Sequence, residues 1–126
     1  MSRVVLIALV LGISICLVGA QIFLKLALGF AGERAPKEAS LPRQIGALLL
    51  TPHFFASTIA LLIGGFLWLF LVTSGAELSF VYPLLSVSYV LMMVVAHFVF
   101  GETITMKKLF GTLVICLGIV VLLWKG

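Results

Sequence analysis

Four long apolar stretches divide this chain of 126 residues. Each is close to or above the roughly 20 helical residues that cross the hydrocarbon core of a bilayer. Because an open sheet leaves backbone groups unpaired in hydrocarbon, we expect every stretch to be a helix. The predicted fold class is therefore all-α, a polytopic membrane protein with one four-helix transmembrane domain over residues 1–126. The predicted spans are residues 4–30, 53–72, 78–100 and 105–124.

The composition supports a lipid environment and excludes several functional classes. Hydrophobic residues make up 63% of the chain and charged residues only 10%, against about 25% charged in a soluble domain. The mean hydropathy is +1.37, which excludes a soluble enzyme domain or a disordered regulator. The net charge of +4 comes from scattered residues rather than a basic run. We therefore expect membrane lipid as a partner and no nucleic acid.

The first connecting segment is polar and leads into a short amphipathic stretch. Residues 31–44 hold five of the twelve charges and two prolines, so this segment must be in water. Residues 45–50, preceded by Leu41, are apolar but too short to cross, which predicts a short interfacial helix along the membrane surface. Thr51 and Pro52 then form a typical N-cap and first helical position for the next span.

The distribution of Lys and Arg predicts the orientation of the chain in the membrane. Five basic residues fall in the first and third connecting segments and two on the opposite side. The excess favours basic loops in the cytoplasm and both termini outside. The five are Arg34, Lys37, Arg43, Lys107 and Lys108, and the two are Arg3 and Lys125.

Small residues recur on one face of the first span and of the last. Gly12 and Ala20 belong to a ridge in the first span that also includes Ala8 and Cys16, and Gly111 and Gly118 lie seven residues apart in the last. Such faces let helices approach closely, within one subunit or between two. The ridge and the glycine pair are therefore predicted to be helix-packing surfaces.

The cysteines and histidines give no sign of a metal site. Cys16 and Cys116 both lie in apolar runs, and we interpret them as small apolar packing residues rather than a disulfide. Together with His53 and His97 they show no paired ligand spacing, so no zinc is expected.

The face of the first span opposite the ridge is polar. It contains Ser14, Gln21 and Lys25, and an amide or ammonium group in hydrocarbon is costly unless it is partnered or hydrated. The long stem of Lys25 allows it either to reach the headgroups or to face an internal cavity. Gln21 lies one turn deeper and is too short to reach the interface, which favours a cavity shared by the two.

The third span carries a second polar stripe. Its hydroxyls either make interhelical hydrogen bonds or line a polar pathway. Pro83 removes a backbone donor and frees a carbonyl near Ser79, which predicts a helix kink beside a cavity. The members of the stripe are Ser79, Tyr82, Ser86, Tyr89, Met93 and His97.

Residues at the end of the third span favour structural roles. His97 is interpreted as a hydrogen-bonding residue rather than a proton relay. Glu102, just before the fourth span, is assigned a helix-end role. No carboxylate lies in the middle of a span, which argues against a proton-coupled pump. The sequence also lacks a catalytic Ser/His/Asp set, a phosphate-binding glycine loop and any cofactor motif, so we expect neither an enzyme nor a bound cofactor.

Three segments resemble the small multidrug resistance and EamA-like branch of the drug/metabolite transporter superfamily. They are GAQIFLKLAL, ELSFVYPLLSVSYV and FGETITMKKLFGTLVICLGIVVLL. Gln21, Lys25 and the run from Tyr82 to Ser86 are most similar to the subunits that flip aminoarabinose linked to undecaprenyl phosphate. The sequence departs from the multidrug exporters at Leu17, where they carry a glutamate, and at Leu85, where they carry a tryptophan.

The resemblance implies a subunit of a dimeric transporter, as homodimer or heterodimer with a similar four-helix chain, in the bacterial inner membrane. Its expected substrate is a polyprenyl-phosphate-linked sugar. Lys25 would pair with the phosphate, and the head group would accept or donate hydrogen bonds at the other predicted substrate-binding residues: Gln21, Tyr82, Ser86 and Tyr89. Two alternatives stay open. One is an exporter of small cations or metabolites, and the other is a non-transporting membrane partner subunit.

Overall fold

The computed structural model describes residues 2–124 and is all-helical over that range. Four segments are long and apolar enough to cross a membrane, which confirms the predicted fold class. Lys125, which entered the charge count above, lies outside the described residues. The helices are α1 (Arg3–Arg34), α2 (Leu41–Leu49), α3 (Pro52–Thr73), α4 (Leu78–Leu84), α5 (Val87–Phe100) and α6 (Met106–Leu123).

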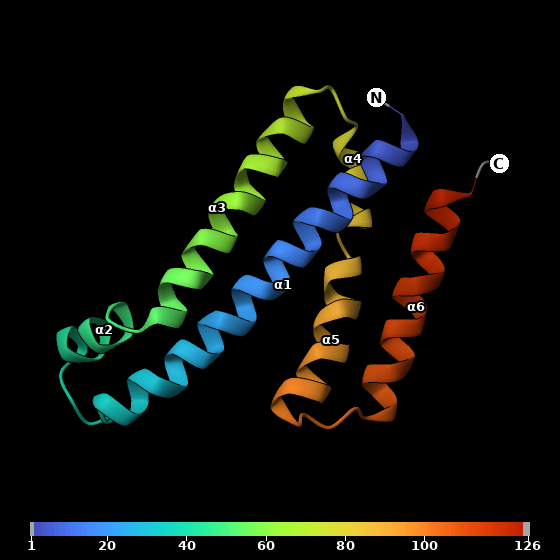
Figure 1. Cartoon of the computed structure of the whole chain (residues 1–126). Helices are drawn as coiled ribbons and strands as arrows, with labels where there is room; N and C mark the ends of the chain where they lie inside the picture. The colour runs from blue at the N-terminus through green and yellow to red at the C-terminus, as the bar shows by residue number, and fades with distance from the viewer. Residues whose placement is uncertain (1, 125–126) are drawn as a thin grey trace.

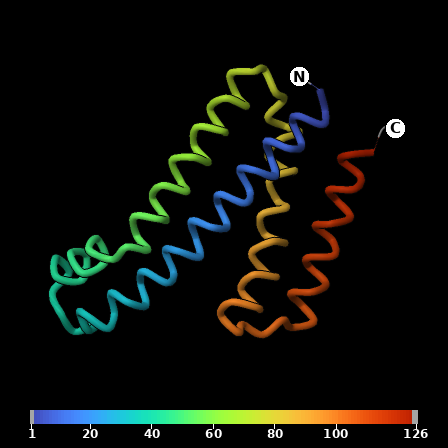
Figure 2. The backbone as a smooth tube through the Cα atoms, viewed as in Figure 1, coloured from blue at the N-terminus to red at the C-terminus, as the bar shows by residue number. Residues whose placement is uncertain are grey.

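The helices form two antiparallel pairs (Figure 1). Helices α1 and α3 lie side by side along most of their length, and α5 and α6 form the second pair, with α5 also in contact with α1. The N-terminus, the α3–α4 turn and the end of α6 lie at one end of the molecule. Helix α2 and the α5–α6 loop lie at the other (Figure 2). The segments with the five basic residues thus share one end, and their assignment to the cytoplasm stays a prediction.

Prolines set the bounds of the first two helices. Helix α1 continues past the predicted end at residue 30, because nothing interrupts it until Ala35, which precedes Pro36 and is extended (φ −136°, ψ 106°), as the residue before a proline prefers. Helix α2 begins at Leu41, earlier than predicted, because Pro42 suits the first turn of a helix.

The third span is interrupted just after Pro83. Helix α4 ends at Leu84, and beyond Leu85 the amides bond three residues back: Ser86 N donates to Pro83 O and Tyr89 N to Ser86 O. Such a 3₁₀ turn has 3.0 residues per turn instead of 3.6. It therefore rotates the residues of α5 relative to those of α4, and the polar stripe predicted for a continuous helix is divided between two directions.

The buried core lies at the end of the molecule near the N-terminus, where α1, α3 and α4 meet. Its fully or almost fully buried side chains come from all three helices. Toward the opposite end, α5 contacts α1 but leaves a cavity open between the two helices. The core residues are Val10, Ile13, Leu71, Val81 and Leu84.

Small residues bring α1 and α3 together. A Cβ built on Gly64 would lie 3.2 Å from the Cβ of Cys16, and one on Gly12 would lie 3.6 Å from Leu67 Cδ1. Ala20 is buried, and its carbonyl oxygen accepts a hydrogen bond from Ser57 Oγ at 2.9 Å. The predicted ridge of α1 therefore contacts α3 inside the subunit.

A substitution at Gly64 tests this close approach. We predict that Gly64→Val lowers the free energy of unfolding by about 1–3 kcal/mol, the usual cost of adding atoms to a packed interface. Gly65→Val is the matched control, because it has the same helix propensity change and no atom within 4 Å of its new Cβ. Thermal unfolding of both variants in detergent micelles measures the difference, and equal losses would contradict the packing.

Candidate functional site

A cavity of about 310 Å³ lies between α1 and α5 at the end of the molecule that carries the basic loops. Gln21 and Lys25 of α1 line it, as the sequence predicts for a shared cavity, together with residues of α5 and the following loop. Ser14, on the same predicted face, is fully buried and its hydroxyl has no hydrogen-bond partner among the residues described. The open part of the polar face therefore begins at Gln21.

Lys25 forms an ion pair with Glu102 across this cavity. The two residues are 77 positions apart, and their side chains stay 53% and 42% exposed. The ammonium group also lies 4.4 Å from the centroid of the Phe100 ring, within the range of a cation–π contact. The side chain of Glu102 thus has a charged partner that the sequence did not indicate, and it does not cap α6. The N-cap of α6 is Thr105, whose hydroxyl accepts from Lys108 N.

The end of α5 fixes the backbone of Glu102. Gly101 takes the left-handed conformation (φ 65°) that commonly ends a helix. The Glu102 amide then donates to Ala96 O at 3.2 Å. His97 Nδ1 donates to the Glu102 carbonyl oxygen at 2.8 Å, so His97 makes the structural hydrogen bond that its position favours. With both backbone groups held, the carboxylate is directed toward Lys25.

The hydrogen bond from Lys25 and its positive charge lower the pKa of the Glu102 carboxyl, with a smaller contribution from the charge of Lys108. Glu102 is thus an anion at neutral pH. Its charge offsets that of Lys25, and the Lys25 cavity contains one positive and one negative group.

The remaining predicted site residues lie in neighbouring cavities or outside them. Tyr89 lines a cavity of about 420 Å³ between α5 and α6, which shares Met92, Ala96 and Glu102 with the Lys25 cavity. Ser86 lines a third cavity of about 300 Å³ with Pro83 and Gly118. Within one chain, the five predicted substrate-binding residues are therefore not brought into a single site.

Tyr82 faces another part of the molecule. Its ring packs edge-to-face on Trp68 of α3, with 5.1 Å between the ring centroids. The 3₁₀ turn after Pro83 is the physical reason that Tyr82 and Tyr89 point in different directions. The sequence predicts the turn residue, but the amount of rotation follows only from the hydrogen bonds that the chain makes around it.

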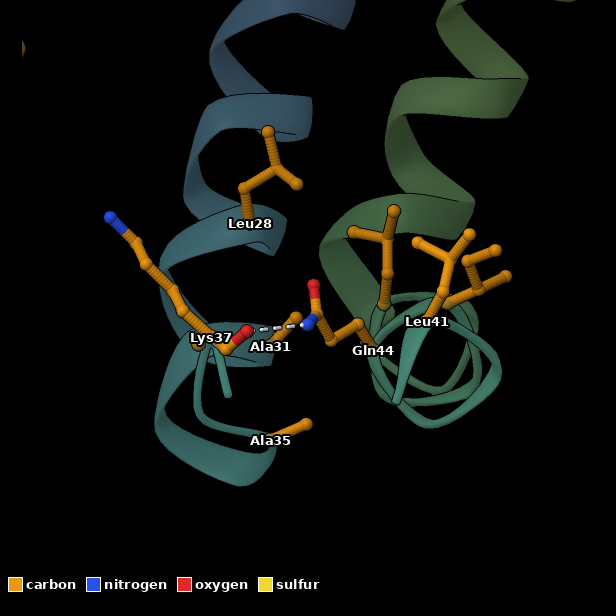
Figure 3. A pocket seen from close by; sticks show the side chains of 9 residues that line it. Leu28, Ala31, Ala35, Lys37, Leu41 and Gln44 are labelled. Atoms are coloured by element: carbon orange, nitrogen blue, oxygen red, sulfur yellow. Dashed lines mark hydrogen bonds between the residues drawn. The ribbon is translucent and has the colours of Figure 1, made fainter. Parts of the chain in front are cut away.

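A further hollow, of about 360 Å³, lies between the end of α1 and α2. Figure 3 shows Leu28 and Ala31 of α1 facing Leu41 and Gln44 across it. Gln44 Nε2 donates to Lys37 O at 2.9 Å and so holds the loop between the two helices closed. The Lys37 side chain points away from the hollow. This hollow therefore lies where α2 packs against the end of α1.

Known proteins support the resemblance seen in the sequence. The chain is 36% identical over 76 residues to a probable 4-amino-4-deoxy-L-arabinose-phosphoundecaprenol flippase subunit, ArnE, of Pseudomonas aeruginosa. The match covers 60% of this chain and spans 65% of the length of that relative. No family model matches the sequence, and no solved structure matches it significantly.

The similarity confirms the resemblance to the aminoarabinose flippase subunits. Together with the four apolar helices, it identifies a multi-pass protein of the bacterial inner membrane.

The ion pair gives the stability a defined pH dependence. A carboxyl with a lowered pKa adds stability that is fully present above its unfolded pKa and is lost as the pH falls through its folded pKa. We therefore predict that Glu102→Gln lowers the melting temperature at neutral pH. The difference from the unsubstituted protein should disappear at a pH well below the ordinary Glu pKa of about 4.3.

Thermal unfolding in detergent at several pH values measures this difference. Glu38→Gln is the control, because it removes the same charge from an exposed loop position that has no ion pair within residues 2–124. A loss in the Glu102→Gln variant that stays constant down to low pH would contradict the prediction.

Proposed function

We propose that this protein is a subunit of a transporter that flips a polyprenyl-phosphate-linked sugar across the bacterial inner membrane. The similarity to a flippase subunit supports the general class. The observation that carries the choice of an anionic substrate is Lys25, a cation on a membrane-spanning helix that lines an open cavity next to Gln21.

The cavity matches the head of such a substrate better than its tail. At about 310 Å³ it is at the small end of ligand pockets, so it accepts a phosphate and part of a sugar. The Lys25 ammonium pairs with the phosphate, and the Gln21 amide hydrogen-bonds a sugar hydroxyl. Leu24, Leu28 and Met92 line the rest of the cavity, which lets the prenyl chain continue into the surrounding lipid.

A partner subunit completes the pathway in this proposal. No residue of α6 is buried in the structure, and a Cβ added at Gly111 or Gly118 would meet no atom within 4 Å. Packing of α6 against a similar four-helix chain, in a homodimer or heterodimer, would use this close-approach face. In the dimer, the separate cavities lined by Lys25, Tyr89 and Ser86 form parts of one larger pathway.

One observation favours a second candidate, an exporter of small cations. Glu102 places a carboxylate in the Lys25 cavity, and a cation site requires a negative group. That carboxylate, however, is paired with Lys25, and a cation entering the cavity would meet the Lys25 ammonium. A third candidate, a non-transporting partner subunit, would use the exposed α6 face but would not require Lys25.

Drug resistance separates the first two candidates. We predict that expression of this protein in a drug-sensitive host gives no resistance to quaternary ammonium compounds, because the carboxylate that lines the Lys25 cavity is paired with Lys25. Growth on a concentration series, with an empty vector as control, measures the effect. Robust resistance would overturn the proposed lipid substrate in favour of cation export.

Substitutions of Lys25 test the site. If the ammonium binds phosphate, its charge matters more than its bulk. We predict partial transport for Lys25→Arg, little for Lys25→Gln and almost none for Lys25→Met. Arginine retains the charge and can bind phosphate through two donors, but in a different geometry. Gln21→Leu should cost less, since it removes a neutral hydrogen bond worth about 0.5–1.5 kcal/mol.

Transport is measured in liposomes containing this chain and its partner, with a radiolabelled polyprenyl-phosphate sugar. Lys37→Met is the matched control, because it removes a lysine from the same end of the molecule outside the Lys25 cavity. Expression and dimer content of each variant separate lost binding from lost folding. Full transport by a well-expressed Lys25→Met variant would exclude Lys25 from the site.

A further inference from the structure

The Lys25 ammonium already has an anionic partner in the structure. Glu102 forms an ion pair with it, and both residues line the same cavity. An ammonium group has three donors, and at least one of them is taken by the carboxylate of a residue that lines the same cavity. A phosphate that binds Lys25 from this cavity must therefore compete with the carboxylate.

A second set of cations lies on the other side of Glu102. Glu102 also lines the cavity between α5 and α6, where Lys107 and Lys108 are part of the wall. The Lys108 ammonium donates to Thr103 O at 3.0 Å, one residue from Glu102, and its charge contributes to lowering the pKa of the Glu102 carboxyl. A carboxylate displaced from Lys25 thus has positive charge close by on α6.

We propose that Glu102 is a positioning residue. Its carboxylate pairs with the Lys25 ammonium in the absence of substrate and is displaced from it by the phosphate of an anionic lipid. The released carboxylate then turns toward Lys107 and Lys108. This inference rests on the proposed function, because the displacement of the carboxylate takes place in the same cavity and precedes tight binding of the phosphate.

The local backbone allows this exchange without a change of fold. The Glu102 amide bonds Ala96 O, and its carbonyl accepts from His97, so only side-chain torsions need to change. Rotamer changes of exposed side chains are fast, on the picosecond to nanosecond scale. The carboxylate can therefore leave and return without limiting the rate of transport.

Because the ion pair is exposed, a phosphate and the Glu102 carboxylate compete for the Lys25 ammonium on similar terms. Both side chains are about half exposed, and water screens such pairs so that they contribute little. A phosphate can therefore displace the carboxylate, which it could not do from a deeply buried pair. A neutral head group gains nothing from Lys25 and does not open the pair. Lys25 is thus the source of any preference for anions, and Glu102 reduces that preference by competing for the ammonium.

The test measures binding to the purified, detergent-solubilised protein. The anionic probe is farnesyl methyl phosphate, a phosphodiester that carries one negative charge, and the neutral probe is farnesyl methyl ether. We expect Glu102→Gln to bind the anionic probe roughly twofold to fivefold more tightly, the change that corresponds to losing an exposed ion pair as competitor. Affinity for the neutral probe should not change.

Two further variants distinguish competition from a general charge effect. Glu38→Gln removes a negative charge from the loop at the same end of the molecule, outside the cavity, and should leave both affinities unchanged. In a Lys25→Met background, Glu102→Gln should give no gain, because the carboxylate then has no ammonium to occupy. Glu102→Ala should reproduce the gain if Glu102→Gln folds poorly.

The results separate this inference from the proposed function. Binding of the anionic probe that depends on Lys25 but is unchanged or weaker in Glu102→Gln would overturn the competition and leave the proposed function intact. A gain that persists in the Lys25→Met background would also overturn it. If the unsubstituted protein and all Glu102 variants bind the anionic probe no better than the neutral one, the proposed function itself fails.

Discussion

The close approach of α1 and α3 is the contact on which the rest of the structure depends. Small residues lie at the crossing, where a Cβ at position 64 would lie 3.2 Å from the Cβ of Cys16, tighter than an ordinary van der Waals contact. A buried hydrogen bond from the Ser57 hydroxyl to the carbonyl oxygen of Ala20 links the two helices. With these two helices fixed, the short helix α4 completes the core at one end, and α5 contacts α1 at the other.

In this arrangement the two halves of α1 have different surroundings. Near the N-terminus, Val10 and Ile13 belong to the buried core. Farther along, Gln21 and Lys25 face a cavity that the neighbouring helix α5 does not fill. The 3₁₀ turn after Pro83 contributes to this difference. Because of it, α4 packs on the core while α5 presents a different set of its residues to α1. One continuous helix thus connects a packed end of the domain to an open one.

The sequence predicts most of the fold and only part of the site. Hydropathy locates all four spans, because twenty apolar residues in a row have few alternatives to a membrane helix. Helical periodicity also places Gln21 and Lys25 together. It fails at Tyr82 and Tyr89, since a 3₁₀ turn changes the angle between them. It also misses Glu102, because a contact between positions 77 residues apart leaves no local pattern. The one available signal was charge: Glu102 is a carboxylate next to a span, and Lys25 is a membrane lysine without an assigned counter-ion.

Helix α6 contributes no buried residue to the domain. Most of its side chains are therefore free of the packing constraints that apply to α1 and α3. Substitutions along α6 change what the chain presents to its neighbours at little cost to its own folding. After a gene duplication, two copies of such a chain can diverge on this helix and acquire a preference for each other, while the buried core stays the same in both. The architecture thus separates the inheritance of the fold from the evolution of partner choice.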